Sequence, residues 1–162
     1  MAWYHDREAR SLILLRYLPL LATLNLMWEA AQVPLYSLWK EATPSYIGFS
    51  VLHCTAGDVM IGGAALLLAV IIGGERSLAQ WRWRRIAVIT TLAGTGYTIF
   101  SEWMNTTVLQ SWAYAEAMPR IGLAGVEIGV SPVAQWLVLP TLALYLARKT
   151  RSAFRGPPPE PR

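Results

Sequence analysis

The sequence predicts an all-α protein embedded in a membrane as a bundle of four helices. The first observation behind this prediction is composition. Of 162 residues, 54% are hydrophobic and only 15% are charged, and the mean hydropathy is +0.35. Soluble domains carry about 25% charged residues because their surfaces face water. The composition therefore excludes an ordinary soluble domain, and it excludes a disordered chain, which requires low hydrophobicity.

The second observation is a set of four apolar stretches, each close to the length of a membrane span. A bilayer core about 30 Å thick needs roughly 20 apolar residues in a helix. The stretches cover about residues 13–36, 51–72, 86–108 and 132–147, and the last is the shortest. We therefore expect one membrane domain over residues 1–150. The remaining segment, 151–162, is rich in proline and is predicted to be a disordered cytoplasmic tail.

The third observation is the placement of the basic residues. All but two of the 14 Lys and Arg residues lie ahead of or just inside the first span, between the second and third, or after the fourth. Only Lys40 and Arg120 occupy the other two connections. The positive-inside rule then places both termini in the cytoplasm of a multi-pass protein of the bacterial inner membrane. The basic charge thus reports topology, and since no basic and aromatic binding motif accompanies it, we expect no nucleic-acid partner.

Polar residues interrupt the spans at regular spacing. Asn25, Glu29 and Gln32 are separated by four and three residues, and so lie on one face of the first helix. The third span repeats this spacing with Thr98, Glu102 and Asn105, the second carries Asp58, and the fourth carries Gln135. With alternating span directions, Glu29, Asp58, Glu102 and Gln135 all fall within about 10 Å of the extracytoplasmic edge.

Two interpretations of this layer stay open. Burying an acidic residue at the centre of a span costs about 2.5 to 3.5 kcal/mol, so carboxyl groups from separate helices at one level favour a shared polar cavity inside the bundle. The other interpretation is that these residues simply lie near the lipid headgroups. The cytoplasmic half is far more apolar, and residues 64–72 contain no polar side chain.

A shared cavity would support acid–base chemistry. Removal from water favours the protonated form of a carboxylic acid, which can then donate its proton. The catalytic candidates are Glu29, Asp58 and Glu102, with His53 as a proton shuttle, although a structural, hydrogen-bonded role for each stays open. The connection 110–131 is aromatic and rich in glycine, and it is either folded over the mouth of the bundle or an ordinary interfacial loop. The ligand-binding candidates come from the polar layer and from this connection: Trp28, Gln32, Asn105, Trp112, Tyr114 and Gln135.

No cofactor is predicted. A divalent metal ion is an alternative, because one histidine and several carboxylates can bind one, but HxxxH, HExxH and CxxC spacings are lacking. The single cysteine, Cys54, excludes an internal disulfide. It is a weak candidate for a nucleophile, because His53 is the only base paired with it by spacing.

The chain resembles small bacterial inner-membrane proteins with four helices, a likeness that covers most of its length and implies a location and a fold but no activity. The segments that carry it are residues 28–36 (WEAAQVPLY), the pair Gly57–Asp58, Glu102, residues 112–119 and residues 131–136 (SPVAQW).

The last third also resembles the membrane lycopene-cyclase domain, in which a Trp-x-Tyr segment and a glycine loop precede a proline-led helix. Here these are Trp112 to Tyr114 and the helix beginning at Pro132, where Gln135 stands in the stretch that carries acids in that family. A looser similarity links His53, Asp58 and Glu102 to the sterol-isomerase type of membrane domain. Both resemblances imply an isoprenoid-like ligand.

These observations lead to three hypotheses. The first is an intramembrane isomerase, cyclase or hydratase that transfers protons on a lipid or isoprenoid substrate. The second is a non-enzymatic accessory subunit that binds a lipid or pigment and has membrane-protein partners. The third is a small proton or metal-ion transporter, which would need polar residues that continue to the cytoplasmic side.

Overall fold

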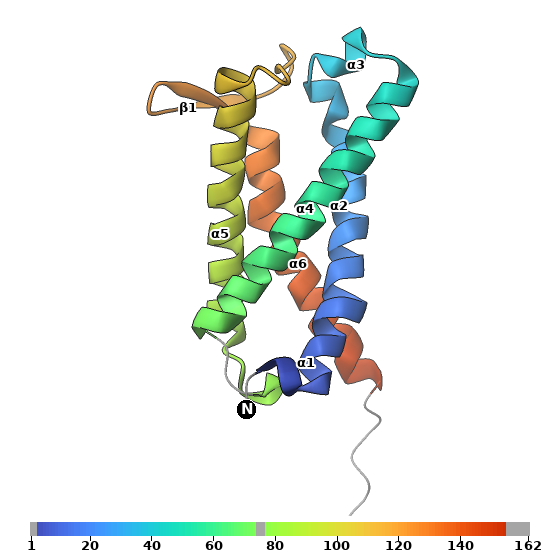
Figure 1. The fold of residues 1–162 in the computed structure, drawn as a ribbon, viewed down its shortest axis with the longest axis vertical. Coiled ribbons are helices and arrows are strands. Elements are labelled where there is room, and N and C mark those ends of the chain that lie inside the picture. Colours follow the sequence, from blue (N-terminus) through green and yellow to red (C-terminus); the bar gives the residue numbers. More distant parts are fainter. Residues whose placement is uncertain (1–2, 74–76, 155–162) are drawn as a thin grey trace, which may run out of the picture.

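Four long helical segments run side by side along the long axis of the molecule (Figure 1). The structure is a computed structural model that describes residues 3–73 and 77–154. The first segment joins α1 (Arg7–Leu12), the π-helical turn η2 (Ile13–Tyr17), α2 (Leu18–Gln32) and the short 3-10 helix η3 (Val33–Leu35). The second is α4 (Pro44–Gly73), the third is α5 (Trp83–Trp103) followed by the π-helical turn η5 (Met104–Val108), and the fourth is α6 (Val130–Phe154).

Short elements connect these segments. The 3-10 helix η1 (Trp3–His5) precedes α1, and η4 (Leu78–Gln80) lies between α4 and α5 at the same end of the bundle. The other end carries α3 (Leu38–Glu41) and a hairpin formed by β1 (Arg120–Leu123) and β2 (Val126–Gly129). The chain therefore runs up, down, up and down along the bundle (Figure 1).

Local sequence signals explain several helix ends. Asp6 caps α1 by accepting a hydrogen bond from the backbone N–H of Glu8 at 2.9 Å, and its second oxygen accepts one from Leu78 at 2.8 Å, which fixes η4 against α1. Thr43 precedes Pro44, and its hydroxyl accepts from the N–H of Tyr46. A capping threonine followed by proline is a common helix start, because proline lacks the N–H that would otherwise have no partner.

The fold is mostly helical, as predicted, and a short β-hairpin lies in the connection between α5 and α6. Its strands pair antiparallel, from Arg120 opposite Gly129 to Leu123 opposite Val126. Ala124 and Gly125 form the turn, both with positive φ (50° and 83°), which is the geometry that matches the twist of a two-residue hairpin. The alternating pattern of residues 120–129 around this turn was the signal for strands in the sequence. The helix α6 also includes residues 151–154, which the sequence analysis assigned to a tail, and the rest of that tail lies outside the described residues.

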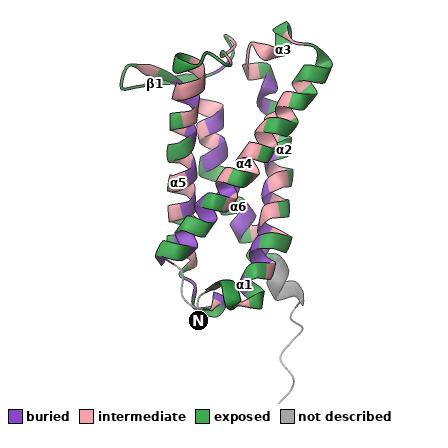
Figure 2. Cartoon of the chain, in the orientation of Figure 1, coloured by how far each residue is buried: buried purple, intermediate pink, exposed green. Residues whose placement is uncertain are grey.

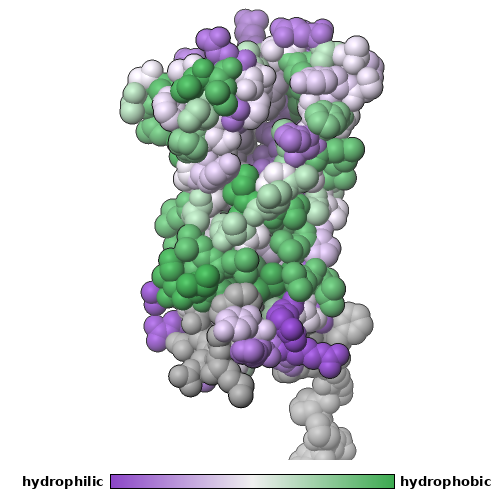
Figure 3. Space-filling model, viewed as in Figure 1, coloured by the Kyte–Doolittle hydropathy of each residue, from purple (hydrophilic) through white to green (hydrophobic). Residues whose placement is uncertain are grey.

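Three of the helical segments are long and apolar enough to cross a membrane: Arg7–Leu35, Pro44–Gly73 and Val130–Lys149. The helix α5 is less apolar, although it packs against both α4 and α6 and its 21 residues span about 31 Å. Many residues along the helices are exposed (Figure 2), and apolar residues cover the middle of the face seen in Figure 3. Leu15, Met60 and Leu92 are more than 60% exposed. A continuous apolar surface of this kind is suited to contact with lipid.

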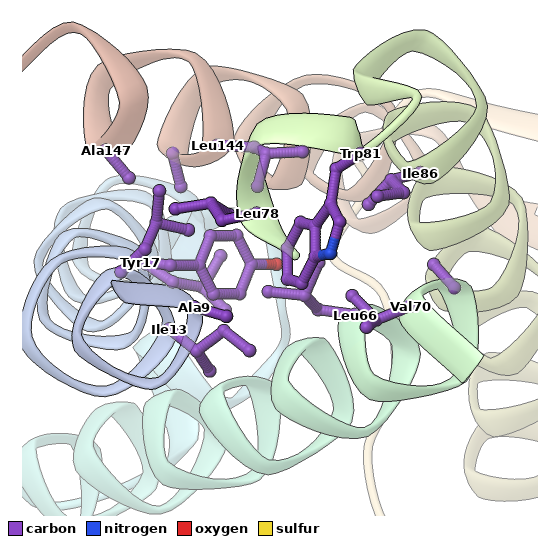
Figure 4. Close-up of a cluster of buried hydrophobic side chains, with 14 residues drawn as sticks. Ala9, Ile13, Tyr17, Leu66, Val70, Leu78, Trp81, Ile86, Leu144 and Ala147 are labelled. Atoms are coloured by element: carbon purple, nitrogen blue, oxygen red, sulfur yellow. The ribbon is translucent and has the colours of Figure 1, made fainter. Parts of the chain in front are cut away.

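The half of the bundle near α1 and η4, called the apolar half below, has a tightly packed core. Side chains from α1, η2, α4, η4, α5 and α6 converge there (Figure 4). Tyr17, Leu66 and Ile86 are completely buried. Because lipid is as apolar as these side chains, close packing and van der Waals contact hold the helices together here.

Candidate functional site: a cluster of carboxyl and amide groups

A hydrogen-bonded cluster occupies the opposite half, near α3 and the hairpin, which is called the polar half below. Its centre is Gln135 on α6, whose side chain is 2% exposed. The amide nitrogen Nε2 donates toward Asn25 Oδ1 at 2.8 Å, Asp58 Oδ2 at 2.8 Å and Glu29 Oε1 at 3.1 Å. An amide nitrogen carries two hydrogens, so these three acceptors on α2 and α4 compete for them.

Gln32 completes the cluster with four hydrogen bonds. Its Nε2 donates to Glu29 Oε1 at 2.7 Å and to Gln135 Oε1 at 3.2 Å. Its Oε1 accepts from the Ser131 hydroxyl at 2.7 Å and from the Trp28 indole N–H at 3.2 Å. The donors and acceptor sites of this buried amide are therefore all used, which fixes its orientation and that of the groups around it.

The local cause of this arrangement is helical spacing. Asn25, Glu29 and Gln32 lie on the same face of α2, as their spacing predicted, and that face is turned toward α6. Asn25 also donates to the carbonyl of Leu21, one turn earlier, at 2.8 Å. In the structure, polar side chains of α2, α4 and α6 therefore lie close together.

Glu29 and Asp58 form a carboxyl pair. Gln135 Nε2 lies within hydrogen-bond distance of both carboxyl groups, which places the two groups close enough to interact directly. A hydrogen bond between them requires a proton, because two carboxylates have only acceptors. Neither forms an ion pair with a described residue. The pair can therefore hold one proton and one negative charge, the combination needed to donate a proton at one position and remove one at another.

Glu102 on α5 is the third carboxyl group, and its side chain is 5% exposed. It accepts a hydrogen bond from the Tyr114 hydroxyl, which in turn accepts one from the Gly129 N–H at 2.9 Å. A side chain at Gly129 would press on the Tyr114 ring, so glycine permits this contact. Glu102 does not hydrogen-bond directly to the cluster, but it lies within electrostatic range of Glu29 and Asp58.

The segment that carries Tyr114 is fixed to the end of α2. The N–H of Ser37 donates to the Ala113 carbonyl, and the N–H of Ala115 donates to the Leu35 carbonyl, each at 2.9 Å. The rings of Tyr36 and Tyr114 are 5.7 Å apart. Burial, reinforced by the hydrogen bond and the charge of Glu102, raises the pKa of Tyr114 above its ordinary value. Tyr114 therefore stays protonated and acts as a donor to Glu102.

Three more side chains lie near Glu102. The hydroxyl of Tyr36 interacts with its carboxyl group, as does the indole of Trp112. The Trp112 Nε1 atom is nevertheless buried and makes no hydrogen bond of ordinary geometry. Cys54, half-buried on α4, is within electrostatic range of Tyr36 and of the carboxyl groups.

Two of the predicted site residues lie apart from the cluster. His53 is exposed on α4 and stacks on Phe49, with ring centroids 5.6 Å apart. The reason is helical geometry, because residues five apart in a helix differ by about 140° in direction, so His53 and Asp58 cannot share a face. Asn105 lies in the π-helical turn η5, where its amide donates back to the Ser101 carbonyl at 2.9 Å.

A tryptophan separates the cluster from the apolar half. Trp136, next to Gln135 in the chain, is 3% exposed. A methyl group at Gly94 of α5 would overlap its ring, and one at Gly62 of α4 would overlap Leu21 and touch Trp136. The two glycines thus let α4 and α5 approach α6 closely around the indole. This ring and the apolar core beyond it close the cluster on that side.

The surface is hollowed in the polar half. Figure 3 shows a recess between the side that carries α3 and α4 and the side that carries α5 and the hairpin, with hydrophilic residues in its depth. Figure 1 shows why: α4 crosses the bundle obliquely, so it lies beside α2 near α3 and reaches α5 at its other end. The recess and the cluster lie in the same half of the bundle.

Sequence reasoning gave less weight to Tyr36, Ser131 and Asn25 than the structure does. Asn25 and Ser131 were noted as polar interruptions, whereas nothing but its position at the end of the first span pointed to Tyr36. As for metals, the residues that the structure describes contain no group of three or more His, Cys, Asp or Glu side chains that could hold an ion.

Comparisons with family models, with curated proteins and with solved structures found no match to this chain. The resemblances drawn from the sequence stay predictions.

Proposed function

We propose that the protein is an intramembrane acid–base enzyme that moves protons on a lipid or isoprenoid substrate. The observation that carries this proposal is the Glu29–Asp58 carboxyl pair, whose two buried acids lie close together and share the hydrogen-bond donor Gln135. A structural role would not require two acids to face each other in a buried place, since polar groups without an ionisable partner would stabilise the bundle equally well.

The reaction that suits this pair is an isomerisation or a proton-initiated cyclisation of an alkene. The protonated member donates its proton to one carbon of a double bond, and the carboxylate removes a proton from a neighbouring carbon. The π electrons form the new C–H bond, and the electrons of the broken C–H bond form the new double bond. No oxidant or reductant is consumed, and the pair still holds one proton and one negative charge after the step. The proton is now on the other carboxyl group, and its transfer back between the two groups, or exchange with solvent, restores the starting arrangement.

A transport function has less support. A transported proton or ion would need polar groups on both sides of the cluster, and the buried residues beyond Trp136 are largely apolar (Leu66, Ala69, Val70, Ile86, Ala143 and Leu144). The cluster is therefore better suited to chemistry at one depth than to passage through the bundle.

The membrane arrangement belongs to the same proposal. In this proposal α5 also crosses the membrane, as the third of four spans in chain order. Both termini are cytoplasmic, and the membrane is a bacterial inner membrane. The support is that Arg7, Arg84 and Arg148 lie at one end of the bundle, on α1, α5 and α6 (Figure 1), as the positive-inside rule requires. Attaching a reporter enzyme to either terminus would test this, with activity expected only from a cytoplasmic reporter.

The test of the chemistry is solvent exchange at carbon. The purified protein is reconstituted in vesicles that contain a linear polyene, an unsaturated sterol or a polyprenol, in D₂O. We expect deuterium to enter one of these lipids at carbon, measured by mass spectrometry. Asp58→Asn keeps an oxygen for Gln135 but removes the acid, so it is expected to lose at least 100-fold in rate, in line with the roughly 10²–10⁴-fold contribution of general acid–base groups.

The matched control is Glu41→Gln, which removes an exposed carboxyl group at the same end of the bundle and is expected to leave exchange unchanged. Exchange that continues normally in Asp58→Asn, or no exchange into any of the three lipids with the wild-type protein, would contradict the proposal.

A further inference from the structure

The charge of the polar half restricts the lipids that can occupy it. Three carboxyl groups, Glu29, Asp58 and Glu102, lie within electrostatic range of one another. In the described part of the chain none of them forms an ion pair. Lys40 is exposed on α3, and Arg120 is already paired with Glu127 at 2.8 Å on the exposed hairpin. The cluster therefore contains negative charge and no opposing cation.

A phosphate group would be unfavourable at this place. Proteins bind phosphate through Arg or Lys side chains, or through N–H groups at the start of a helix. Here a phosphorylated head would face carboxyl groups and would lose its hydration without gaining a cationic partner, and a buried charge without an opposite charge is strongly unfavourable. An uncharged lipid head can lie beside these carboxyl groups without the cost of burying an unpaired charge.

The unused donor indicates what that head carries. The Trp112 N–H is buried beside Glu102 and lacks a hydrogen bond of ordinary geometry. A buried donor left without an acceptor is destabilising, so an oxygen brought to it by a ligand would be bound favourably. Tyr36 lies close by, and its hydroxyl also interacts with Glu102.

We infer that the site takes an uncharged lipid whose head carries a hydroxyl or carbonyl oxygen, held near Trp112 and the Glu29–Asp58 pair, and that it rejects phosphorylated lipids with the same tail. The apolar tail extends through the recess into the surrounding lipid. This inference rests on the proposed function, of which it names the substrate class.

The test compares two probes with one tail: geranylgeraniol and geranylgeranyl phosphate. The full-length protein in phosphatidylcholine nanodiscs is titrated with each, and binding is measured by native mass spectrometry. Alkylation of Cys54, the single cysteine of the chain, by N-ethylmaleimide localises the ligand. We expect the alcohol to bind at least 10-fold more tightly than the phosphate and to slow alkylation, because Cys54 lies beside the carboxyl groups.

Trp112→Phe is expected to weaken binding of the alcohol about 3- to 10-fold, the effect of one lost hydrogen bond. Trp112→His, which keeps a ring N–H, is expected to restore part of this loss. Trp39→Phe is the matched control, since Trp39 is half exposed on α3, and it should leave binding unchanged. Because Trp112→His keeps an N–H donor, partial recovery of binding in this variant shows that Trp112→Phe weakens binding through the lost donor and not through a disturbed fold.

Equal or tighter binding of the phosphate, no protection of Cys54 by the alcohol, or full binding by Trp112→Phe would each overturn the inference. These outcomes differ from failure of the proposed function. Proton exchange into a phosphorylated lipid would overturn the inference and keep the enzyme, whereas selective binding of the alcohol without exchange would keep the inference and remove the enzyme.

Discussion

The polar and apolar halves are built from the same four helical segments, yet they are held together differently. In the apolar half, Leu66, Val70 and Ile86 fill space among neighbours of the same kind. In the polar half, Gln135 and Gln32 hold α2, α4 and α6 together through directed hydrogen bonds. The first kind of contact depends on shape, whereas the second depends on which atoms meet.

This difference shows how the protein can keep an acidic site stable inside an apolar bundle. Van der Waals packing tolerates small changes of volume if neighbours adjust, but a buried polar network loses several contacts when one member is removed. The apolar half supplies a rigid base, and Trp136 marks the border between the two.

Gly94→Ala should have the largest effect, because it disturbs the border itself. The added methyl group overlaps the Trp136 ring, which is buried and cannot move aside, so we expect a loss of about 3 kcal/mol in the free energy of unfolding. Thermal unfolding in detergent measures this. Gly96→Ala on the same helix meets no atom within 4 Å and should be neutral or slightly stabilising. Equal effects at the two glycines would contradict the close packing.

Gln135→Leu should come next. It keeps the approximate volume of the side chain but leaves Asn25, Glu29 and Asp58 without their shared donor. Leaving buried polar groups unpaired costs about 1–3 kcal/mol, so we expect the unfolding free energy to fall by about 2 kcal/mol. Gln80→Leu changes an exposed glutamine of η4 and should alter it by less than about 0.5 kcal/mol. If both variants were equally stable, the cluster would not hold the helices together.

Tyr114→Phe should cost about 1 kcal/mol, since it removes the bonds to Glu102 and Gly129. It also makes a prediction about pH. Because the pKa of Tyr114 is raised in the folded protein above its ordinary value of 10.0, its contribution to stability is complete below pH 10 and is lost at higher pH as the unfolded chain ionises.

The measurement is the unfolding free energy between pH 8 and pH 11. Stability should fall above pH 10 less steeply in Tyr114→Phe than in the wild-type protein. Tyr97→Phe is the control, since Tyr97 is exposed on α5, and it should keep the steep fall. The same pH dependence in both variants would show that Tyr114 is not the buried donor.

His53→Ala should have the smallest effect. His53 faces outward and contacts Phe49, so we expect less than about 0.5 kcal/mol in stability and unchanged proton exchange, in contrast to Asp58→Asn. Deuterium incorporation and thermal unfolding test this together. A loss of exchange as large as that of Asp58→Asn would show that His53 takes part in the reaction after all.

By itself, the sequence determined the helices, their approximate ends and the residues that share a face within one helix. The repeat of 3.6 residues per turn fixes such relations locally, which is why Asn25, Glu29 and Gln32 were grouped correctly. The same rule, applied to α4, would have separated His53 from Asp58. The alternation of residues 120–129 would have indicated the hairpin.

Only the tertiary structure decided which faces meet. The choice of Gln135 as the shared donor, the pairing of Glu29 with Asp58 and the bond between Tyr114 and Glu102 depend on how each helix is rotated about its axis. That rotation is set by close contacts between segments far apart in the chain, such as Gly62 and Gly94 around Trp136. A local repeat holds no information on such contacts, because they arise from the shapes of side chains that meet only when the bundle has formed.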